Sequence, residues 1–289
     1  MQIISPNFSD LFTPNIEIGR FPDGDSHVRI PQIKNYQGKE VFVFHRLYPK
    51  QNSSLVELFL ILESLNEEGS AVNVVIPYLP YARQDKKKLD GEVASAIALC
   101  GILKKMGCEK LYTLDCHFLN AAGAAEFAGL PIENISMGAE LVAHAAKFFG
   151  GEEFEIVAPD AGASYLVKDQ GGKAFKKIRK EYNGDKIGYR NIESMEVDFD
   201  IKGKNIFILD DMISTGSTML KALEMCREAG VKKVCVGATH GLFLYNCVDK
   251  MKKLTDCVFS TDSIVSPQAE VSIKQKLENL GKEEFPKLF

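Results

Sequence analysis

The stretch Asn205–Leu220, NIFILDDMISTGSTML, constrains the fold of this 289-residue chain more than any other. Its four apolar residues at 206–209 are too few for a helix and are typical of a buried parallel strand. Two carboxylates, Asp210 and Asp211, follow where that strand is expected to end, and a helix is predicted over Met219–Ala229. In open α/β sheets, ligands bind at the carboxyl ends of the strands. The stretch therefore predicts an α/β fold with a ligand site at this strand end.

The short loop between the carboxylates and the predicted helix has the chemistry of a phosphate site. Backbone N–H groups at a helix start hold phosphates, and this loop supplies one glycine and four hydroxyls: Ser214, Thr215, Gly216, Ser217 and Thr218. Asp210 and Asp211 suit sugar hydroxyls or, through water, a divalent cation. An ordinary Ser or Thr helix cap is the alternative, but a cap does not explain two like charges at a buried strand end. The stretch resembles the phosphoribosyl-diphosphate motif of the phosphoribosyltransferase fold.

The composition narrows the class of protein. A formal net charge of −4 argues against a general basic field for nucleic acid. The seven cysteines are scattered without a CxxC pair, which is typical of reduced thiols in a cytosolic protein. The first ten residues do not resemble a signal peptide, and no apolar run has the length of a membrane span. We expect a cytoplasmic protein that binds neither nucleic acid nor membrane.

Strand-like and helix-like segments alternate along the chain, which predicts mostly parallel sheets flanked by helices. Strands are expected at 1–4, 27–30, 40–45, 72–77, 110–114, 154–158, 206–209, 233–237 and 257–260. Helices are expected at 53–65, 92–106, 138–149, 163–169, 219–229 and 269–280. The basic stretch Lys173–Tyr189 is expected to include a hairpin or a mobile loop. We place a domain boundary at Gly150–Gly151, giving two similar α/β units, 1–150 and 151–289, without a detectable sequence repeat.

Three further groups of residues carry charge or metal-ligand chemistry. Arg83, Gln84 and Asp85 follow a buried strand, and the guanidinium and amide suit phosphate oxygens or a purine edge. His117, also at a strand end, is either an ordinary core histidine or a partner of Asp160 in holding Mg²⁺. The cations at 176–180 form either a solvated hairpin or a loop that closes over polyphosphate. The chain has neither a GxxxxGK[ST] loop nor a GxGxxG turn after a strand.

Five motifs, in order and separation, closely resemble those of the ribose-phosphate pyrophosphokinase (phosphoribosyl-diphosphate synthetase) family over nearly the whole chain. They are FPDGD at Phe21–Asp25, IPYLPYARQDKK at Ile76–Lys87, LDCH at Leu114–His117, APDAG at Ala158–Gly162 and LDDMISTGST at Leu209–Thr218. The FPDG and YARQD motifs are absent from ordinary phosphoribosyltransferases. The chain length and the THGLF stretch at Thr239–Phe243 look most like the archaeal branch.

The resemblance implies two phosphoribosyltransferase-like domains, ATP on the N-terminal side and ribose 5-phosphate on the C-terminal side. The β,γ-diphosphoryl group of ATP would move to the anomeric hydroxyl of the sugar, releasing AMP. Asp210, Asp211 and the 214–218 loop would bind the sugar phosphate. ATP would contact Phe21, Asp23, Asp25, Arg83, Gln84, Asp85 and His117. In this family the FPDG-type loop enters a neighbouring subunit, which implies a homodimer or a higher homo-oligomer.

The resemblance also implies Mg²⁺ at His117 and Asp160, and catalysis by His117 with the Lys-x-Arg pair, Lys177 and Arg179. A shift of one or two residues would instead place Arg179 and Glu181 at that pair. Asp25 stands where the family usually has Glu, and the usual first helix is missing. Diphosphoryl transfer needs positioning and positive charge more than a covalent nucleophile, in agreement with these residue types. A catalytically weak regulatory paralogue and a phosphoribosyltransferase are the alternatives; the latter leaves FPDGD and YARQDKK unexplained.

Overall fold

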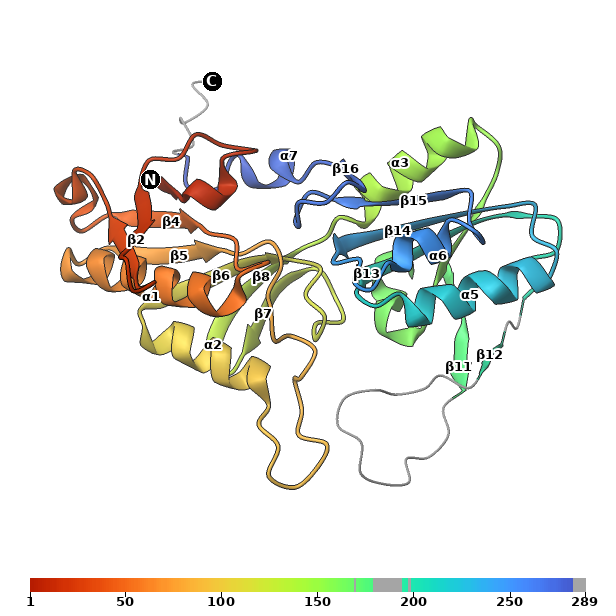
Figure 1. Ribbon diagram of the computed structural model, residues 1–289, viewed down its shortest axis with the longest axis horizontal. Coiled ribbons are helices and arrows are strands. Elements are labelled where there is room, and N and C mark those ends of the chain that lie inside the picture. Colours follow the sequence, from red (N-terminus) through yellow and green to blue (C-terminus); the bar gives the residue numbers. More distant parts are fainter. Residues whose placement is uncertain (169, 179–193, 197–198, 283–289) are drawn as a thin grey trace, which may run out of the picture. The chain divides into compact units, whose positions relative to one another are not determined.

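The computed structural model describes residues 1–282 except 169, 179–193 and 197–198. The chain forms two compact units, one of Met1–Ile135 with the segment from Ile273 onward, the other of Ser136–Ser272. Each unit contains a six-stranded sheet (Figure 1). Within the described residues, no helix has both the length and the apolar character that crossing a membrane requires.

The first unit is built on a sheet in the order β1-β4-β5-β6-β8-β7. Every neighbouring pair in it is parallel except β7–β8, which is antiparallel. The strands are β1 (Gln2–Ile4), β4 (Glu40–Phe44), β5 (Ala71–Val75), β6 (Cys108–Leu114), β7 (Gly123–Phe127) and β8 (Leu130–Ile135). Strands β2 (Glu17–Arg20) and β3 (Ser26–Arg29) form a separate antiparallel hairpin. The helices are α1 (Gln51–Glu67), α2 (Ser95–Lys105) and α7 (Lys274–Leu277).

Alternation along β4 divides the core of the first unit between the two faces of its sheet. Val41 and Val43 pack in one cluster with the buried faces of α1 and α2. Phe42 and Phe44 belong to the opposite face, where the Phe44 ring lies 5.8 Å from the ring of Phe8. A Cβ added to Gly281 would lie 2.6 Å from the Phe42 ring, so the C-terminal segment covers this second face.

The second unit is built on an all-parallel sheet in the order β10-β9-β13-β14-β15-β16. Its strands are β10 (Lys173–Ala174), β9 (Glu155–Ala158), β13 (Asn205–Ile213), β14 (Lys233–Gly241), β15 (Cys257–Thr261) and β16 (Ala269–Val271). Its helices are α3 (Gly138–Phe149), α4 (Ser164–Lys168), α5 (Ser217–Glu228) and α6 (Cys247–Met251). Backbones of β11 (Lys176–Ile178) and β12 (Ser194–Glu196) pair antiparallel.

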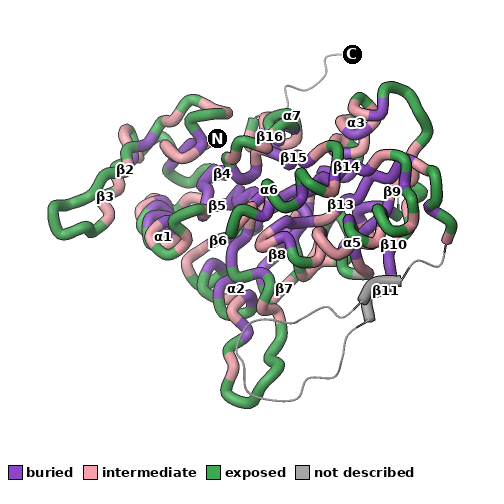
Figure 2. Tube along the Cα trace, turned by 45° about the vertical axis from the view of Figure 1, so that its right-hand side comes forward, coloured by how far each residue is buried: buried purple, intermediate pink, exposed green. Residues whose placement is uncertain are grey.

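Helices of the second unit pack on the two faces of its sheet. Met219, Leu223 and Cys226 of α5 share an apolar cluster with Ile206 and Ile208 of β13. On the other face an aromatic cluster connects α3 to the sheet: Phe149, Phe154, Phe207 and Phe259. The buried character of both faces explains the continuous apolar runs of these strands (Figure 2).

The predicted α/β class is confirmed, and most predicted elements lie within a few residues of their expected positions. The strand predicted at 206–209 is corrected, because β13 continues through both carboxylates to Ile213. Met212 and Ile213 pair with His240 and Gly241, so β14 also extends beyond its predicted end. The carboxylates therefore belong to the strand itself, and the loop begins at Ser214.

Other differences have local physical causes. The helix expected from Glu92 begins at Ser95, because the Glu92 carboxylate accepts hydrogen bonds from the N–H groups of Lys88 and Leu89 and closes the preceding loop. The closing helix expected over 269–280 is wrong over its first part: Ala269–Val271 adds strand β16 to the open edge of β15, and α7 keeps only four residues. The β7–β8 hairpin and α6 had no counterpart among the predictions.

The boundary between the compact units lies between Ile135 and Ser136, whereas the sequence suggested residue 150. Helix α3 belongs to the second unit because its apolar face packs on β13, β14 and β15. From Ile273 the chain returns to the first unit, where the side-chain amide of Gln2 donates to the Leu280 carbonyl. The first unit is therefore made of two separate pieces of chain.

Candidate functional site

The predicted phosphate loop lies in the second unit, between the end of β13 and the start of α5. Gly216 is the N-cap residue of α5 in the left-handed conformation, with φ +75°. The N-cap residue is a glycine, so this helix does not begin with an ordinary Ser or Thr at that position. The hydroxyls of Thr215 and Ser217 lie 3.4 Å apart. The start of a twelve-residue helix next to a glycine and several hydroxyls is a suitable anion site.

Three carboxylates lie at the carboxyl ends of the neighbouring strands β9 and β13. The Asp211 N–H donates to Asp210 Oδ1 over 2.9 Å, and Asp211 is only 7% exposed. Burial, then the charge of Asp211, and also that of Asp160, raise the pKa of Asp210 well above its ordinary value. This concentration of negative charge favours a bound cation or hydroxyl donors at the same edge.

Asp160 is the second residue after β9, and its side chain shapes the turn after the strand. Its Oδ1 accepts the N–H of Gly162 over 2.8 Å, where the short helix of Ala161–Ala163 forms. A Cβ added to Gly162 would lie 3.0 Å from that oxygen, so the small residue keeps the carboxylate in place. The APDAG sequence thus fixes a carboxylate at a strand end.

In the first unit, Arg83, Gln84 and Asp85 follow β5 on an exposed loop. Gln84 is anchored to the start of α2, because its carbonyl accepts the Ala96 N–H and its Oε1 accepts the Ser95 hydroxyl. These hydrogen bonds therefore fix the side-chain amide of Gln84 relative to α2. Arg83 is exposed.

His117 lies in the same unit, in the turn after the neighbouring strand β6, and is exposed. The turn is held by Asn134 of β8, a buried residue that sequence reasoning missed. Asn134 Oδ1 accepts the Cys116 N–H over 2.8 Å, and its Nδ2 donates to the Ala121 carbonyl over 2.7 Å. A polar residue in the otherwise alternating LPIENI strand was the available signal. Because His117 is exposed, it is not an ordinary core histidine.

Phe21, Asp23 and Asp25 occupy the tip of the β2–β3 hairpin and are exposed (Figure 2). The Phe21 N–H donates to the Asp25 carbonyl over 2.8 Å, and the positive φ of Gly24, +98°, closes the turn. Asp23 Oδ1 accepts the Asp25 N–H. Phe21 is 52% exposed, and the centre of its ring lies 5.3 Å from that of His27.

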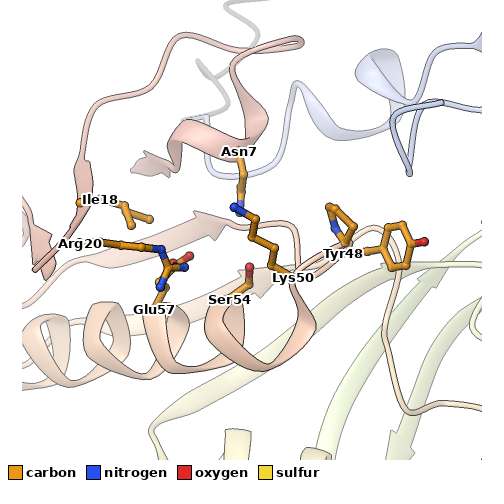
Figure 3. A pocket seen from close by; sticks show the side chains of 9 residues that line it. Asn7, Ile18, Arg20, Tyr48, Lys50, Ser54 and Glu57 are labelled. Atoms are coloured by element: carbon orange, nitrogen blue, oxygen red, sulfur yellow. The ribbon is translucent and has the colours of Figure 1, made fainter. Parts of the chain in front are cut away.

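A cavity of about 370 Å³ lies at the base of this hairpin, between β2 and the start of α1 (Figure 3). Arg20 and Glu57 form an ion pair of 3.0 Å in its wall. None of the predicted site residues lines it; the lining is Asn7, Ile18, Gly19, Arg20, Tyr48, Pro49, Lys50, Ser54 and Glu57.

The predicted catalytic pair is only partly within the described structure. The backbone of Lys177 belongs to β11 and pairs with Met195 of β12, a strand that lies beyond the basic stretch in which a hairpin was expected. Arg179 and Glu181 lie outside the described residues. Among the described residues, no three His, Cys, Asp or Glu side chains are grouped as a metal site.

Comparisons with known proteins cover almost the entire chain. Residues 9–107 match the N-terminal domain of ribose phosphate pyrophosphokinase, and residues 142–272 match the phosphoribosyl transferase domain. The chain is 34% identical to the ribose-phosphate pyrophosphokinase of Pyrococcus furiosus, over 92% of both chains. It is 36% identical to that of Pyrococcus abyssi, over 93% of this chain and 91% of the relative.

A solved structure, phosphoribosylpyrophosphate synthetase from Mycobacterium smegmatis, is similar in fold with a TM-score of 0.78. The similarity covers 97% of this chain and 96% of that one, at 24% sequence identity. The two-domain α/β architecture predicted from the sequence is thus that of a known synthetase.

Proposed function

The chain belongs to the ribose-phosphate pyrophosphokinase family, and from that premise we propose which of its residues bind the substrates and carry the reaction. The enzyme transfers the β,γ-diphosphoryl group of ATP to the anomeric hydroxyl of ribose 5-phosphate. The products are 5-phosphoribosyl 1-diphosphate and AMP. The anomeric oxygen bonds to the β-phosphorus of ATP and gives its proton to the solvent. The bond between the β-phosphorus and the oxygen that bridges to the α-phosphorus breaks, and that oxygen leaves with AMP.

Ribose 5-phosphate binds to the second unit in this proposal. Its phosphate accepts hydrogen bonds from the start of α5 and from the loop hydroxyls, namely Ser214, Thr215, Ser217 and Thr218. The start of the twelve-residue helix α5 at Gly216, directly after the loop hydroxyls, is the observation that carries this assignment. Asp210 and Asp211 accept hydrogen bonds from the sugar hydroxyls, which offsets the cost of two adjacent carboxylates.

ATP binds to residues of the first unit. Arg83 and Gln84 contact phosphate oxygens or the base, and the anchoring of Gln84 to α2 supports a fixed geometry for that contact. Asp85 belongs to the same loop. The exposed tip residues Phe21, Asp23 and Asp25 complete the ATP site of a neighbouring copy, so the protein acts as a homodimer or a higher homo-oligomer. Phe21 is 52% exposed, so part of its ring is accessible for such a contact.

Mg²⁺ is the proposed cofactor, held by His117 and Asp160 together with substrate phosphates. The negative charge on Asp160, Asp210 and Asp211 suits a divalent cation, and Mg²⁺ commonly takes one or two carboxylates and completes its shell with phosphate oxygens and water. When bound, the ion would neutralise charge on the transferred group. Lys177 and Arg179 add positive charge as the diphosphoryl group moves, and His117 completes the catalytic set.

A cytoplasmic location is part of the same proposal. Burial keeps the pKa of the thiols of Cys100, Cys108 and Cys226 raised, to about 12 in each case. All seven cysteines, which lie in the described part of the chain, are free. Reduced thiols support a compartment that is not oxidising.

The test follows the products by ³¹P NMR with Mg²⁺, ATP and ribose 5-phosphate. AMP should appear in step with the sugar diphosphate in the wild-type protein. Asp211→Asn should reduce kcat/KM for ribose 5-phosphate by about a hundredfold, because a buried sugar partner loses its charge. The matched control, Asp256→Asn, changes a half-exposed aspartate paired with Arg227 at the opposite end of the sheet and should retain activity.

Near-normal turnover by Asp211→Asn would contradict the placement of the sugar. Lys177→Ala and Arg179→Ala should each lower kcat, with the KM for ribose 5-phosphate nearly unchanged. If only Arg179→Ala lowers kcat, the register with Glu181 applies instead. ATP left untouched by a protein that binds both substrates would favour the catalytically weak paralogue.

A further inference from the structure

The segment that follows β14 lies against the beginning of the phosphate loop. The N–H groups of Leu242 and Phe243 both donate to the Ile213 carbonyl, over 3.0 and 3.1 Å. The Leu244 N–H donates to the Ser214 carbonyl over 2.9 Å. These bonds hold the backbone at the point where it leaves β13 and enters the loop.

The same segment has an uncommon backbone conformation. Phe243, Tyr245 and Asn246 have φ values of +48°, +57° and +56°, a region that residues other than glycine seldom occupy. A Cβ added to Gly241 would collide with the Phe243 ring, so the glycine before the segment is required by the packing of Phe243. Three such residues within four positions indicate a geometry that the surrounding structure imposes.

The loop glycine rests directly on the residue that ends this segment. A Cβ added to Gly216 would lie 2.8 Å from the Cβ of Cys247 and 3.3 Å from its Sγ. Cys247 is fully buried as the first residue of α6, and its thiol lies 3.7 Å from the Ser214 carbonyl. Helix α6 also packs against α5, the helix that the loop begins (Figure 1).

We propose that residues 242–247 position the phosphate loop. The contact between Cys247 and Gly216 fixes the loop backbone in the position that binding of ribose 5-phosphate requires. The inference rests on the proposed assignment of the loop to the sugar phosphate. The segment does not touch the substrate in this proposal; it acts through Ser214 and Gly216. Its effect is therefore specific to one substrate.

The chain offers a matched pair of glycines at the two ends of α5. Gly216 precedes the helix with φ +75°, and Gly230 follows it with φ +74°. A Cβ at Gly230 would meet only Lys202 Cγ, at 3.8 Å, whereas a Cβ at Gly216 would collide with Cys247. Gly216→Ala and Gly230→Ala thus add the same backbone strain, and only the first adds the contact.

The experiment measures KM for both substrates and the melting temperature of each variant. Gly216→Ala should raise KM for ribose 5-phosphate about tenfold or more, with KM for ATP nearly unchanged, and Gly230→Ala should change either KM less than about twofold. Adding Cys247→Gly to Gly216→Ala makes room for the new methyl group. The double variant should have a KM for ribose 5-phosphate at least about threefold lower than that of Gly216→Ala alone. A double-mutant cycle measures this coupling.

If Gly216→Ala does not fold, Cys247→Ala and Cys247→Ser replace it. Loss of the sulfur should raise KM for ribose 5-phosphate alone, and the serine of similar size should restore it. Equal effects of Gly216→Ala and Gly230→Ala, or no effect of Cys247→Ala, would overturn the inference. Ser217→Ala separates the two hypotheses: if it raises KM for ribose 5-phosphate while the cycle shows no coupling, only the positioning role fails. If it too has no effect, the assignment of the loop fails and the inference with it.

Discussion

At the scale of single residues, His45 is a fully buried histidine whose surroundings require a neutral ring. Nε2 lies 2.9 Å from the Ser54 carbonyl, which needs a proton on that nitrogen, and Nδ1 lies 2.8 Å from the Ser5 hydroxyl, which can donate to it. Burial lowers the pKa of His45 to about 4. Glu57 lies 3.9 Å from Nε2, but its closer partner is Arg20, at 3.0 Å, so we do not count an ion pair with His45.

This histidine should make the stability of the protein depend on pH. The unfolded chain binds the proton near pH 6.5 and the folded chain only near 4, so the stabilisation is complete above 6.5 and is lost as pH falls through that interval. Between pH 7 and 5 His45 alone should lower the free energy of unfolding by about 2 kcal/mol, while Asp210, whose pKa is raised, acts in the opposite direction. Urea unfolding at both pH values measures it, and His45→Gln should lack this component. An equal loss in that variant would assign the pH dependence to other groups.

At the scale of secondary structure elements, the β2–β3 hairpin is attached to α1 by the side chain of Glu57. Its Oε1 accepts hydrogen bonds from Arg20 of β2, over 3.0 Å, and from Ser26 of β3, over 3.4 Å. The Glu57 side chain is 10% exposed and that of Arg20 42% exposed. A second pair on the same hairpin, Glu17 and Arg29, is about 60% exposed on both sides and links only the two strands.

The two ion pairs should contribute differently to the free energy of unfolding. Glu57→Gln should lower the free energy of unfolding by about 1 kcal/mol, a value already reduced for the exposed guanidinium. Glu17→Gln, the control, should cost less than about 0.5 kcal/mol. If the hairpin tip binds ATP, Glu57→Gln should also raise KM for ATP, because the ion pair that helps to hold β2 on α1 is lost. Chemical denaturation measures the first effect and steady-state kinetics the second. Equal free energies of unfolding and equal KM values for ATP in the two variants would show that the Glu57 ion pair does not stabilise the hairpin.

At the scale of the whole molecule, the two units differ in chain continuity. The second unit is one uninterrupted segment, whereas the first needs the chain from Ile273 onward. Ile273 and Leu277 are 0% and 1% exposed, and the Lys274 ammonium lies 5.8 Å from the centre of the Phe12 ring. The returning segment therefore supplies core and cover to the first unit.

Isolated fragments that correspond to the two units should differ in thermal stability. Residues 136–272 alone should melt cooperatively, because their core is continuous. Residues 1–135 alone should aggregate or melt at a lower temperature, since the second face of their sheet loses its cover. Joining residues 273–289 to 1–135 through a short Gly/Ser linker should restore the melt, as followed by circular dichroism. A fragment 1–135 as stable as the joined form would contradict this account.

The amino-acid sequence by itself determined the α/β class, the position of the loop before α5 and the residue types of the candidate site. These depend on short contiguous patterns: apolar runs, an adjacent carboxylate pair, a glycine with hydroxyls, and a turn such as FPDGD. Residues within such a segment stay together in any fold that keeps the strand or the turn. The hydrogen bond that closes the Phe21–Asp25 turn is of this local kind.

Only the tertiary structure decided the rest. The extension of β13 past Asp211 depends on pairing with His240 and Gly241, and the return of the chain at Ile273 depends on an uncovered sheet face. The hydrogen bonds of Asn134 with Cys116 and Ala121 join residues 18 and 13 positions apart, and the contact of Cys247 with Gly216 joins residues 31 positions apart (247 − 216). Which distant side chains meet is set by the packing of whole elements, because each local pattern is compatible with many partners.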